Sequence, residues 1–208
     1  MSSVTPRVFV VDDDPSVRKS LTRLLSFAGY EVETFTSSLD FLSRDPYEGA
    51  CCLVLDVQMP GPSGIDLQAT LSAAGRPMSI VFVTGHVDVP MSVLAMKAGA
   101  VDLLTKPVDE KDLLEAIGRA VAQDAQERSD VAQVGEIEDR VATLTPRERD
   151  VFARVVTGML NKQIAFELGR AEKTVKVHRA RVMRKMRAES LAELVRMAYR
   201  IGVSGPRS

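Results

Sequence analysis

The feature that most constrains the fold is a regular alternation of strand-like and helix-like segments through the first 124 residues. Short apolar runs rich in β-branched residues, such as 8–11 and 51–55, are typical of strands buried on both faces. Between the strands, residues 15–28 carry apolar side chains at helical spacing, with Asp14-Pro15 suited to the start and Gly29 to the stop. Strands are expected at 8–11, 32–35, 51–55, 80–83 and 101–104, and helices at 15–28, 39–42, 65–73, 91–98 and 109–122. Five such units predict one doubly wound parallel α/β sheet.

Charged and polar side chains stand at the ends of four of these strands. In a parallel sheet the carboxyl ends of the strands share one edge, which is where such folds bind ligands. Carboxylates gathered there repel one another unless a divalent cation lies among them. The residues expected at this edge are Asp12, Asp13, Asp56, Thr84 and Lys106.

The acidic members suit a magnesium site. Mg²⁺ prefers oxygen ligands and retains waters, so we expect Asp13 and Asp56 to bind it and Asp12 to hold one of its waters. The backbone carbonyl of Gln58 is a further candidate ligand.

The same set suits phosphoryl chemistry. Asp56 is a plausible nucleophile toward a phosphoryl group, which would give an acyl phosphate. The cation and the Lys106 ammonium would neutralise the transferring oxygens, and Thr84 could donate a hydrogen bond to one of them. Each of these residues alone is more often a turn or capping residue, so the expectation rests on the set.

Charge divides the chain into an acidic and a basic part. Residues 1–124 hold 10 lysines and arginines against 17 aspartates and glutamates, whereas residues 125–208 hold 17 against 11. We therefore expect a first domain over 1–124, a helical linker over 125–140 and a basic domain over 141–208. No secretory signal and no apolar run of about 18 residues is present, so we expect a cytoplasmic protein with no membrane partner.

The basic part is expected to be entirely helical and to contain a helix-turn-helix. Two helices, 162–168 and 172–187, flank a three-residue turn with Gly169. One face of the second helix is apolar, and the other is basic with a small apolar centre, which suits a DNA major groove. Base contacts are expected from Lys176 and Arg181, thymine-methyl contacts from Val177 and Ala180, and phosphate contacts from Lys173, Thr174, Arg184, Asn161 and Lys162.

Residues 7–122 resemble the receiver domain of two-component response regulators. The strings V-V-D-D-D-P, L-D-V-Q-M-P-G-P-S-G, V-T-G-H, A-M-K-A-G-A-V-D and K-P carry the resemblance. It implies a flavodoxin-like (CheY-like) five-stranded fold, phosphorylation of Asp56 by a sensor histidine kinase, and a requirement for Mg²⁺ or Mn²⁺. It also implies a switch through Thr84 and an aromatic residue on the fifth strand, whose place Leu103 takes here.

Residues 144–202 resemble the LuxR-type helix-turn-helix, through L-T-P-R-E-R-D-V, N-K-Q-I-A-F-E-L-G and E-K-T-V-K-V-H-R. With G-H-V-D-V-P-M in the first part, the chain is similar to the FixJ branch of the FixJ/NarL regulators. The resemblance implies a transcription factor that dimerises on phosphorylation and binds a double-stranded DNA operator in the nucleoid. RNA polymerase is a further candidate partner.

Two alternatives stay open from the residues. The acidic site could serve a Mg²⁺-dependent aspartyl-nucleophile phosphatase, but that class carries a second acid where this chain has Gln58. The chain could also bind DNA independently of phosphate, with its first domain used only for dimerisation. We therefore expect no enzyme activity beyond self-phosphorylation and slow self-dephosphorylation at Asp56.

Overall fold

The computed structural model describes residues 5–85 and 89–203. The chain divides into two compact units, Met1–Arg128 and Ser129–Ser208, which we call unit 1 and unit 2. Among the described residues, no helix is both long and apolar enough to cross a membrane.

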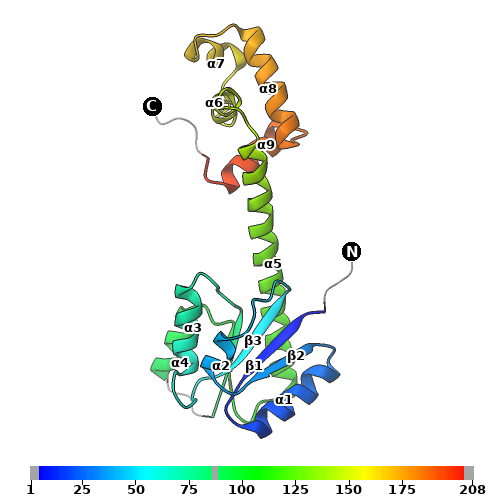
Figure 1. Ribbon diagram of the computed structural model, residues 1–208, viewed down its shortest axis with the longest axis vertical. Coiled ribbons are helices and arrows are strands. Elements are labelled where there is room, and N and C mark those ends of the chain that lie inside the picture. The colour runs from blue at the N-terminus through cyan, green and yellow to red at the C-terminus, as the bar shows by residue number, and fades with distance from the viewer. Residues whose placement is uncertain (1–4, 86–88, 204–208) are drawn as a thin grey trace. The chain divides into compact units, whose positions relative to one another are not determined.

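Unit 1 is built on one five-stranded sheet (Figure 1). All pairings are parallel, and the strand order is β2-β1-β3-β4-β5, so the direction of winding reverses beside β1. The strands are β1 (Arg7–Val11), β2 (Glu31–Phe35), β3 (Cys51–Asp56), β4 (Ile80–Thr84) and β5 (Asp102–Thr105). The predicted doubly wound fold is confirmed, although the fifth strand lies one residue later than expected.

Helices cover both faces of this sheet. They are α1 (Pro15–Phe27), α2 (Ser38–Leu42), α3 (Gly64–Ala73), α4 (Val89–Lys97) and α5 (Glu110–Ala142). On one face, Phe41 of α2, Leu67 of α3 and Ala95 of α4 are buried, and on the other, Leu25 of α1 and Ile117 of α5. All six residues of β3 are buried, which explains why its sequence is apolar without alternation.

Helix α5 is longer than the sequence pattern suggested. It was expected to end near residue 122, with a helical linker following, and it continues as one helix to Ala142. Helix α5 contains no proline, and its two glycines, Gly118 and Gly135, each weaken a helix by only about 1 kcal/mol, so nothing in the backbone chemistry stops it. The buried Asp124 carboxylate accepts a hydrogen bond from the Cys51 backbone N–H (2.9 Å), which fastens α5 to the start of β3. Within α5, the same carboxylate pairs with Arg128 Nε at 2.6 Å.

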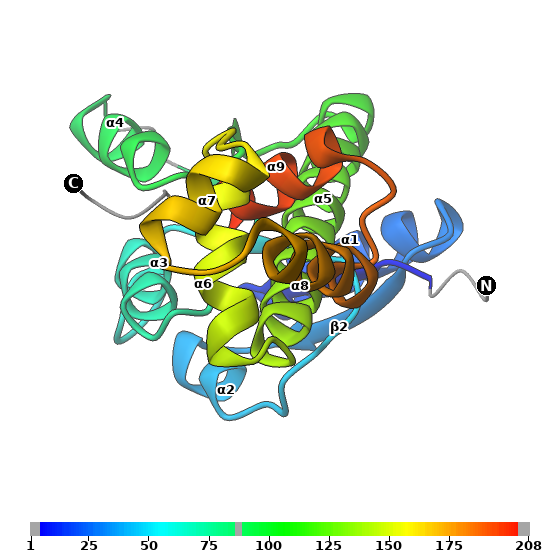
Figure 2. The same ribbon diagram turned by 90° about the horizontal axis from the view of Figure 1, so that it is seen from above.

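Unit 2 is a helical bundle of α6 (Pro146–Val155), α7 (Asn161–Glu167), α8 (Glu172–Met186) and α9 (Leu191–Arg200). The turn between α7 and α8 can be followed in Figure 2. Phe152, Ile164, Val182 and Leu194, one from each helix, meet in its core. This confirms the expected four-helix architecture around a helix-turn-helix.

The end of α5 also contributes to the core of unit 2. Ile137 is buried there, Val141 packs against the same cluster, and Leu144, just after the end of α5, is buried with them. The 3-4 spacing of apolar residues that follows residue 133 therefore serves packing within the chain. Part of the expected linker belongs physically to this core.

One detail of α7 differs from expectation. The helix that the sequence places at 162–168 begins one residue earlier, at Asn161, and its N-cap position is Leu160. The cap is replaced by the Gln163 side chain, whose Oε1 accepts a hydrogen bond from the Leu160 backbone N–H at 2.7 Å. The Asn161 amide is used instead in a contact with α8.

Candidate functional site

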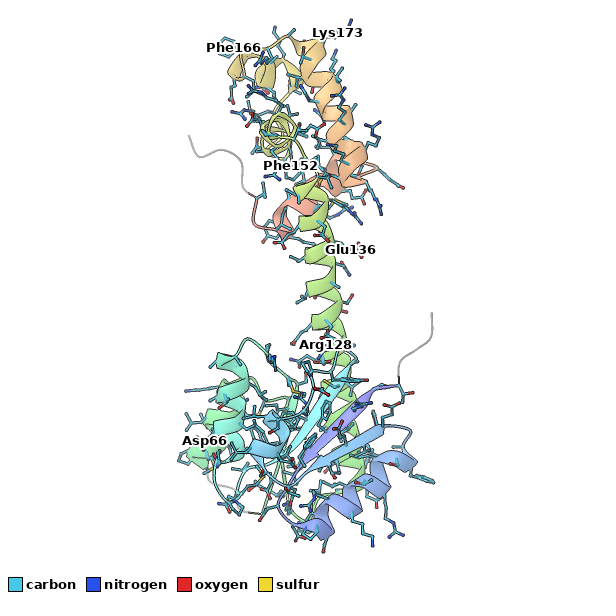
Figure 3. All side chains as sticks on the ribbon, in the orientation of Figure 1. Asp66, Arg128, Glu136, Phe152, Phe166 and Lys173 are labelled. Atoms are coloured by element: carbon cyan, nitrogen blue, oxygen red, sulfur yellow. The ribbon has the colours of Figure 1, made fainter. Side chains whose placement is uncertain are left out.

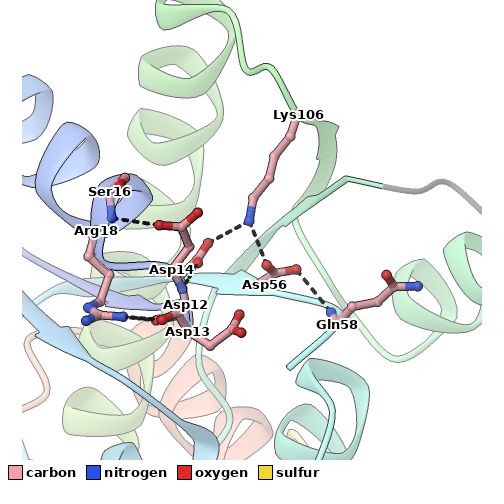
Figure 4. Close-up of polar contacts among 8 residues, drawn as sticks. All are labelled: Asp12, Asp13, Asp14, Ser16, Arg18, Asp56, Gln58 and Lys106. Carbon is pink, nitrogen blue, oxygen red and sulfur yellow. Dashed lines mark hydrogen bonds and ion pairs between the residues drawn. The ribbon is translucent and has the colours of Figure 1, made fainter. Parts of the chain in front are cut away.

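The structure brings the predicted acidic residues together at the carboxyl edge of the sheet (Figure 4). Asp12 and Asp13 follow β1 directly, and Asp56 is the last residue of β3. One carboxylate oxygen from each of the three lies within 4.8 Å of the others. Asp12 and Asp56 are buried and Asp13 is exposed, so the cluster opens to solvent on one side.

Lys106, the residue after β5, joins two of these carboxylates. Its Nζ lies 2.7 Å from Asp12 Oδ2 and 2.6 Å from Asp56 Oδ2. Burial raises the pKa of Asp12, although the hydrogen bond from Lys106 opposes that rise. Burial acts to lower the pKa of Lys106, but its bonds to both carboxylates outweigh this and hold that pKa above the usual value. The lysine is therefore a fixed positive charge at the base of the site.

Backbone and arginine contacts hold the two loops that carry the aspartates. Asp12 Oδ1 accepts a hydrogen bond from the Asp14 backbone N–H, and Asp56 Oδ1 accepts one from the Gln58 backbone N–H. Arg18 Nη1 donates to the backbone carbonyls of Asp12 (2.6 Å) and Asp13 (2.9 Å). Arg18 was missed at the level of sequence, because its position one turn into α1 carries no signal in spacing or motif.

The two remaining predicted residues lie on adjacent strands. Thr84 ends β4 and is buried, and its backbone carbonyl accepts a hydrogen bond from the Lys106 backbone N–H at 2.8 Å. Leu103 lies on β5, half-buried against the core on the α3 and α4 face of the sheet. The Lys106-Pro107 peptide bond is cis. Residues 86–88, within the FixJ-like string, fall outside the described residues.

The donor set fits a hard divalent cation. Three carboxylates supply oxygen ligands only, and their repulsion is offset within the described residues by one lysine. Mg²⁺ binds through one or two carboxylates while keeping waters and substrate oxygens, which suits a cluster open on one side.

The predicted DNA-binding residues of α8 share its exposed face. The buried positions are Val175, Val182 and Met186, as the projection of the helix required. Lys173 extends from the first turn of α8, away from the core residue Phe152 (Figure 3). The exposed positions are Lys173, Thr174, Lys176, Val177, Ala180, Arg181 and Arg184.

One ion pair and one hydrogen bond involve residues on or beside the exposed face of α8. Lys176 Nζ lies 3.3 Å from Glu172 Oε1, so this lysine must leave an exposed ion pair to contact a base. Arg179 Nη1 donates to Asn161 Oδ1 at 3.1 Å, which leaves the Asn161 amide N–H groups to act as donors. Arg179 was missed because its helical position is intermediate between the two faces. Lys162 is exposed on α7.

Family models match both parts of the chain. The model described as the response regulator receiver domain matches residues 8–118, which is more than half of the chain. The chain belongs to the response regulators. The model described as bacterial regulatory proteins of the luxR family matches residues 142–198, so this response regulator has a LuxR-type DNA-binding domain.

Relatives of this response regulator share the same organisation. It is 47% identical to nodulation protein W of Bradyrhizobium diazoefficiens over 197 residues, covering 95% of this chain and 87% of that protein. It is 43% identical to the transcriptional regulatory protein FixJ of the same organism, covering 94% and 96% of the two chains. The response regulator protein TodT of Pseudomonas putida is 44% identical over 97% of this chain and 88% of its own.

Solved structures agree. The response regulator StyR is 48% identical with a TM-score of 0.84, covering 94% of this chain and 99% of StyR. Full-length FixJ from B. japonicum is 43% identical with a TM-score of 0.56, covering 94% and 97% of the two chains. The expected family, fold class and function as a response-regulator transcription factor are confirmed.

Proposed function

We propose that this response regulator accepts a phosphoryl group on Asp56 from a sensor histidine kinase and thereby controls its binding to DNA. The observation that carries the proposal is the position of Lys106 Nζ, within 2.7 Å of the Asp12 and Asp56 carboxylates at the edge of the sheet. A buried carboxylate held against a protonated lysine, beside two further acids, is suited to receive an anion.

The transfer itself is a displacement at phosphorus. An oxygen of the Asp56 carboxylate forms the new P–O bond while the P–N bond to the kinase's phosphohistidine breaks, and the leaving imidazole takes up a proton from water. Lys106 moves its hydrogen bond from Asp56 Oδ2 to a phosphoryl oxygen and stays paired with Asp12. The Thr84 hydroxyl donates a hydrogen bond to a second phosphoryl oxygen.

Asp12, Asp13, Asp56 and the Gln58 carbonyl would hold Mg²⁺ or Mn²⁺. When bound, the cation supplies positive charge that screens the carboxylates from the incoming phosphoryl oxygens. Asp12 remains bound to Lys106 and places it; Asp13, being exposed, is the member that solvent reaches first.

The same residues limit the chemistry to storage of a phosphate. Small phosphodonors would also label Asp56, so the protein catalyses its own phosphorylation. Gln58 is exposed and stands where a phosphatase carries an acid. Its amide does not ionise, so it cannot protonate a leaving group. Self-dephosphorylation is therefore slow, and turnover on other substrates is not supported.

The output is sequence-specific DNA binding by a phosphorylation-dependent homodimer. The receiver domain comprises residues 1–124, the helical linker 125–140 and the DNA-binding domain 141–208.

Thr84 and Leu103 form the switch, with Leu103 repacking in place of an aromatic side chain. The α8 residues contact the operator, with Asn161 and Lys162 at phosphates. RNA polymerase is the further partner, and the protein works in the cytoplasm at the nucleoid.

Acyl-phosphate labelling tests the acceptor. With a small phosphodonor and Mg²⁺, the wild-type chain should become labelled in a form labile to hydroxylamine, and Asp56→Asn should abolish the label. Asp45→Asn, at an exposed acid of the same unit, is the matched control and should label normally. Labelling that survives in Asp56→Asn would exclude Asp56 as the acceptor.

A DNA-selection assay tests the output. Selection from random duplexes, with and without phosphodonor, should yield one enriched sequence whose affinity rises on phosphorylation. The Asp56→Asn chain should bind it at the unphosphorylated level in both conditions. Equal enrichment by both proteins in both conditions would favour the phosphate-independent alternative.

A further inference from the structure

A cavity of about 240 Å³ lies in unit 2 beside the exposed face of α8. It lies where the start of α6, the turn before α8 and the first two turns of α8 come together. Its apolar floor includes Val151 and Leu168, and its polar lining consists of Arg147, Arg170, Thr174 and His178. Such a volume is several times the space of one water molecule, about 30 Å³.

The cavity is strongly cationic. Arg170 is exposed and makes no side-chain ion pair within the described residues, and the only acid that Arg147 meets there is Asp150, at 3.5 Å on the surface. An exposed ion pair of this kind is weak and exchanges readily for another anion. Two guanidinium groups from different elements thus converge on one space, and none of its lining residues is acidic.

Three further polar groups lie at or beside this cavity. Helix α8 begins at Ala171, which provides no side-chain cap, so the first backbone N–H groups of a 15-residue helix lack that partner. His178 Nδ1 is buried without a hydrogen-bond partner among the described residues. The Thr174 hydroxyl lies in the same lining.

We propose that this cavity is a subsite for one phosphodiester of the DNA backbone, held by Arg147 and Arg170 at the start of α8. Arg147 and Arg170 are the residues added here to the DNA-binding set, and the inference rests on the proposed binding of DNA by α8. A bound phosphate here fixes the position of α8 along the groove, because phosphate contacts set register while base edges are read elsewhere on the helix.

The positive charge around the cavity favours a phosphate of the DNA backbone as its ligand. Its lining residues Thr174 and Val175 stand in the chain between Lys173 and Lys176, which lie on the exposed face proposed to enter the groove. A phosphate held at the start of α8 is therefore continuous with the sugar-phosphate backbone that borders that groove.

The test measures the affinity of the full-length phosphorylated protein for its selected operator by fluorescence anisotropy at several salt concentrations. Arg147→Ala and Arg170→Ala should each weaken binding by about tenfold and reduce the slope of log K against log salt by about 1. Arg170→Lys should keep the slope and recover part of the affinity. Arg196→Ala, at an exposed arginine of α9 outside this cavity, is the matched control and should match wild type.

A second arm locates the phosphate. Operators carrying one neutral methylphosphonate at each backbone position in turn should reveal one position per half-site where neutralisation weakens wild-type binding. At that position the methylphosphonate should not weaken the binding of the Arg170→Ala protein any further. Such non-additivity in a double-mutant cycle indicates that Arg170 contacts that phosphate directly.

The outcomes separate the two levels of inference. Wild-type protein that selects no operator would contradict the proposed function. Wild-type protein that binds normally, with Arg147→Ala and Arg170→Ala indistinguishable from Arg196→Ala, would overturn the subsite alone. So would methylphosphonate losses that are equal for wild type and Arg170→Ala at every position.

Discussion

At the scale of single residues, Glu148 is the most tightly bound acid of unit 2. It is 2% exposed, and its Oε2 accepts hydrogen bonds from Lys185 Nζ (2.7 Å) and the Thr145 backbone N–H (2.9 Å). The bond from Lys185 and that from Thr145 lower the pKa of Glu148 to about 2. One carboxylate thereby closes the capping box of α6 and ties that helix to α8.

This lowered pKa predicts a specific loss of stability in acid. Because the folded pKa lies below the unfolded value, the contribution of Glu148 is complete above about pH 4.5 and is lost as pH falls toward about 2. Glu148→Gln should lower the free energy of unfolding of unit 2 by about 1 kcal/mol near neutral pH. In urea unfolding repeated at about pH 3, the difference between the two proteins should shrink.

A matched variant isolates the effect. Glu167→Gln removes an ion pair between the half-buried Arg154 and the exposed Glu167, and it should cost a few tenths of a kcal/mol, with little dependence on pH. A Glu148→Gln deficit that stays constant from neutral pH to about pH 3 would show that charge is not its origin.

At the scale of elements, α8 is a helix with one end left incomplete. Its C-terminal end is closed by Arg187 in the left-handed conformation, at φ 54°, whereas Ala171 at the N-cap provides no side-chain bond. Helices α1, α2, α3, α6 and α9 all have an N-cap side chain that accepts a hydrogen bond. The helix proposed to enter DNA thus lacks the side-chain cap that these five helices have.

Restoring the cap should stabilise this helix. Ala171→Ser should raise the free energy of unfolding of unit 2 by about 0.5–2 kcal/mol, because the serine oxygen accepts from a first-turn N–H. Chemical denaturation followed by circular dichroism measures the change. Ala180→Ser, within the same helix, has no unsatisfied N–H to meet and should give no increase; a gain there equal to that of Ala171→Ser would exclude capping as the cause.

At the scale of the whole molecule, α5 is the element shared by both units. Ala116 and Ile117 are buried in the core of unit 1, and Ile137 is buried in the core of unit 2. Between them the helix is largely exposed, and Ala132 is one such position. We therefore expect α5 to carry a change in the core of unit 1 to unit 2.

Breaking α5 in its exposed middle should therefore uncouple DNA binding from phosphorylation. Ala132→Pro removes a backbone hydrogen bond and costs about 3 kcal/mol of local helix stability. We expect normal acyl-phosphate labelling and normal basal DNA affinity, with the rise in affinity on phosphorylation reduced toward none. Ala132→Ser is the control and should respond as wild type. Full coupling in Ala132→Pro would show that an unbroken α5 is unnecessary.

Much of the fold was predictable because local patterns and packing agree. Apolar β-branched runs predicted the strands, and Asp14-Pro15 and Thr145-Pro146 marked the starts of α1 and α6. The predicted ends of β5 and α5 were less accurate. Hydrophobic spacing does not mark where a helix stops when no proline or other helix-breaking residue follows. The burial of Ile137 in the core of unit 2 was not predicted, because the apolar spacing around it does not say what the residue packs against.

The sequence by itself determined the succession of strands and helices along the chain and which carboxylates stand at strand ends. Both follow from the spacing of the apolar residues and from position in the chain. Only the tertiary structure decided that Lys106 bridges Asp12 and Asp56, that Arg18 braces their loops and that Asp124 fastens α5 to β3. These contacts join residues that are distant in the chain or that carry no motif. Their partners are selected by packing, which no local pattern encodes.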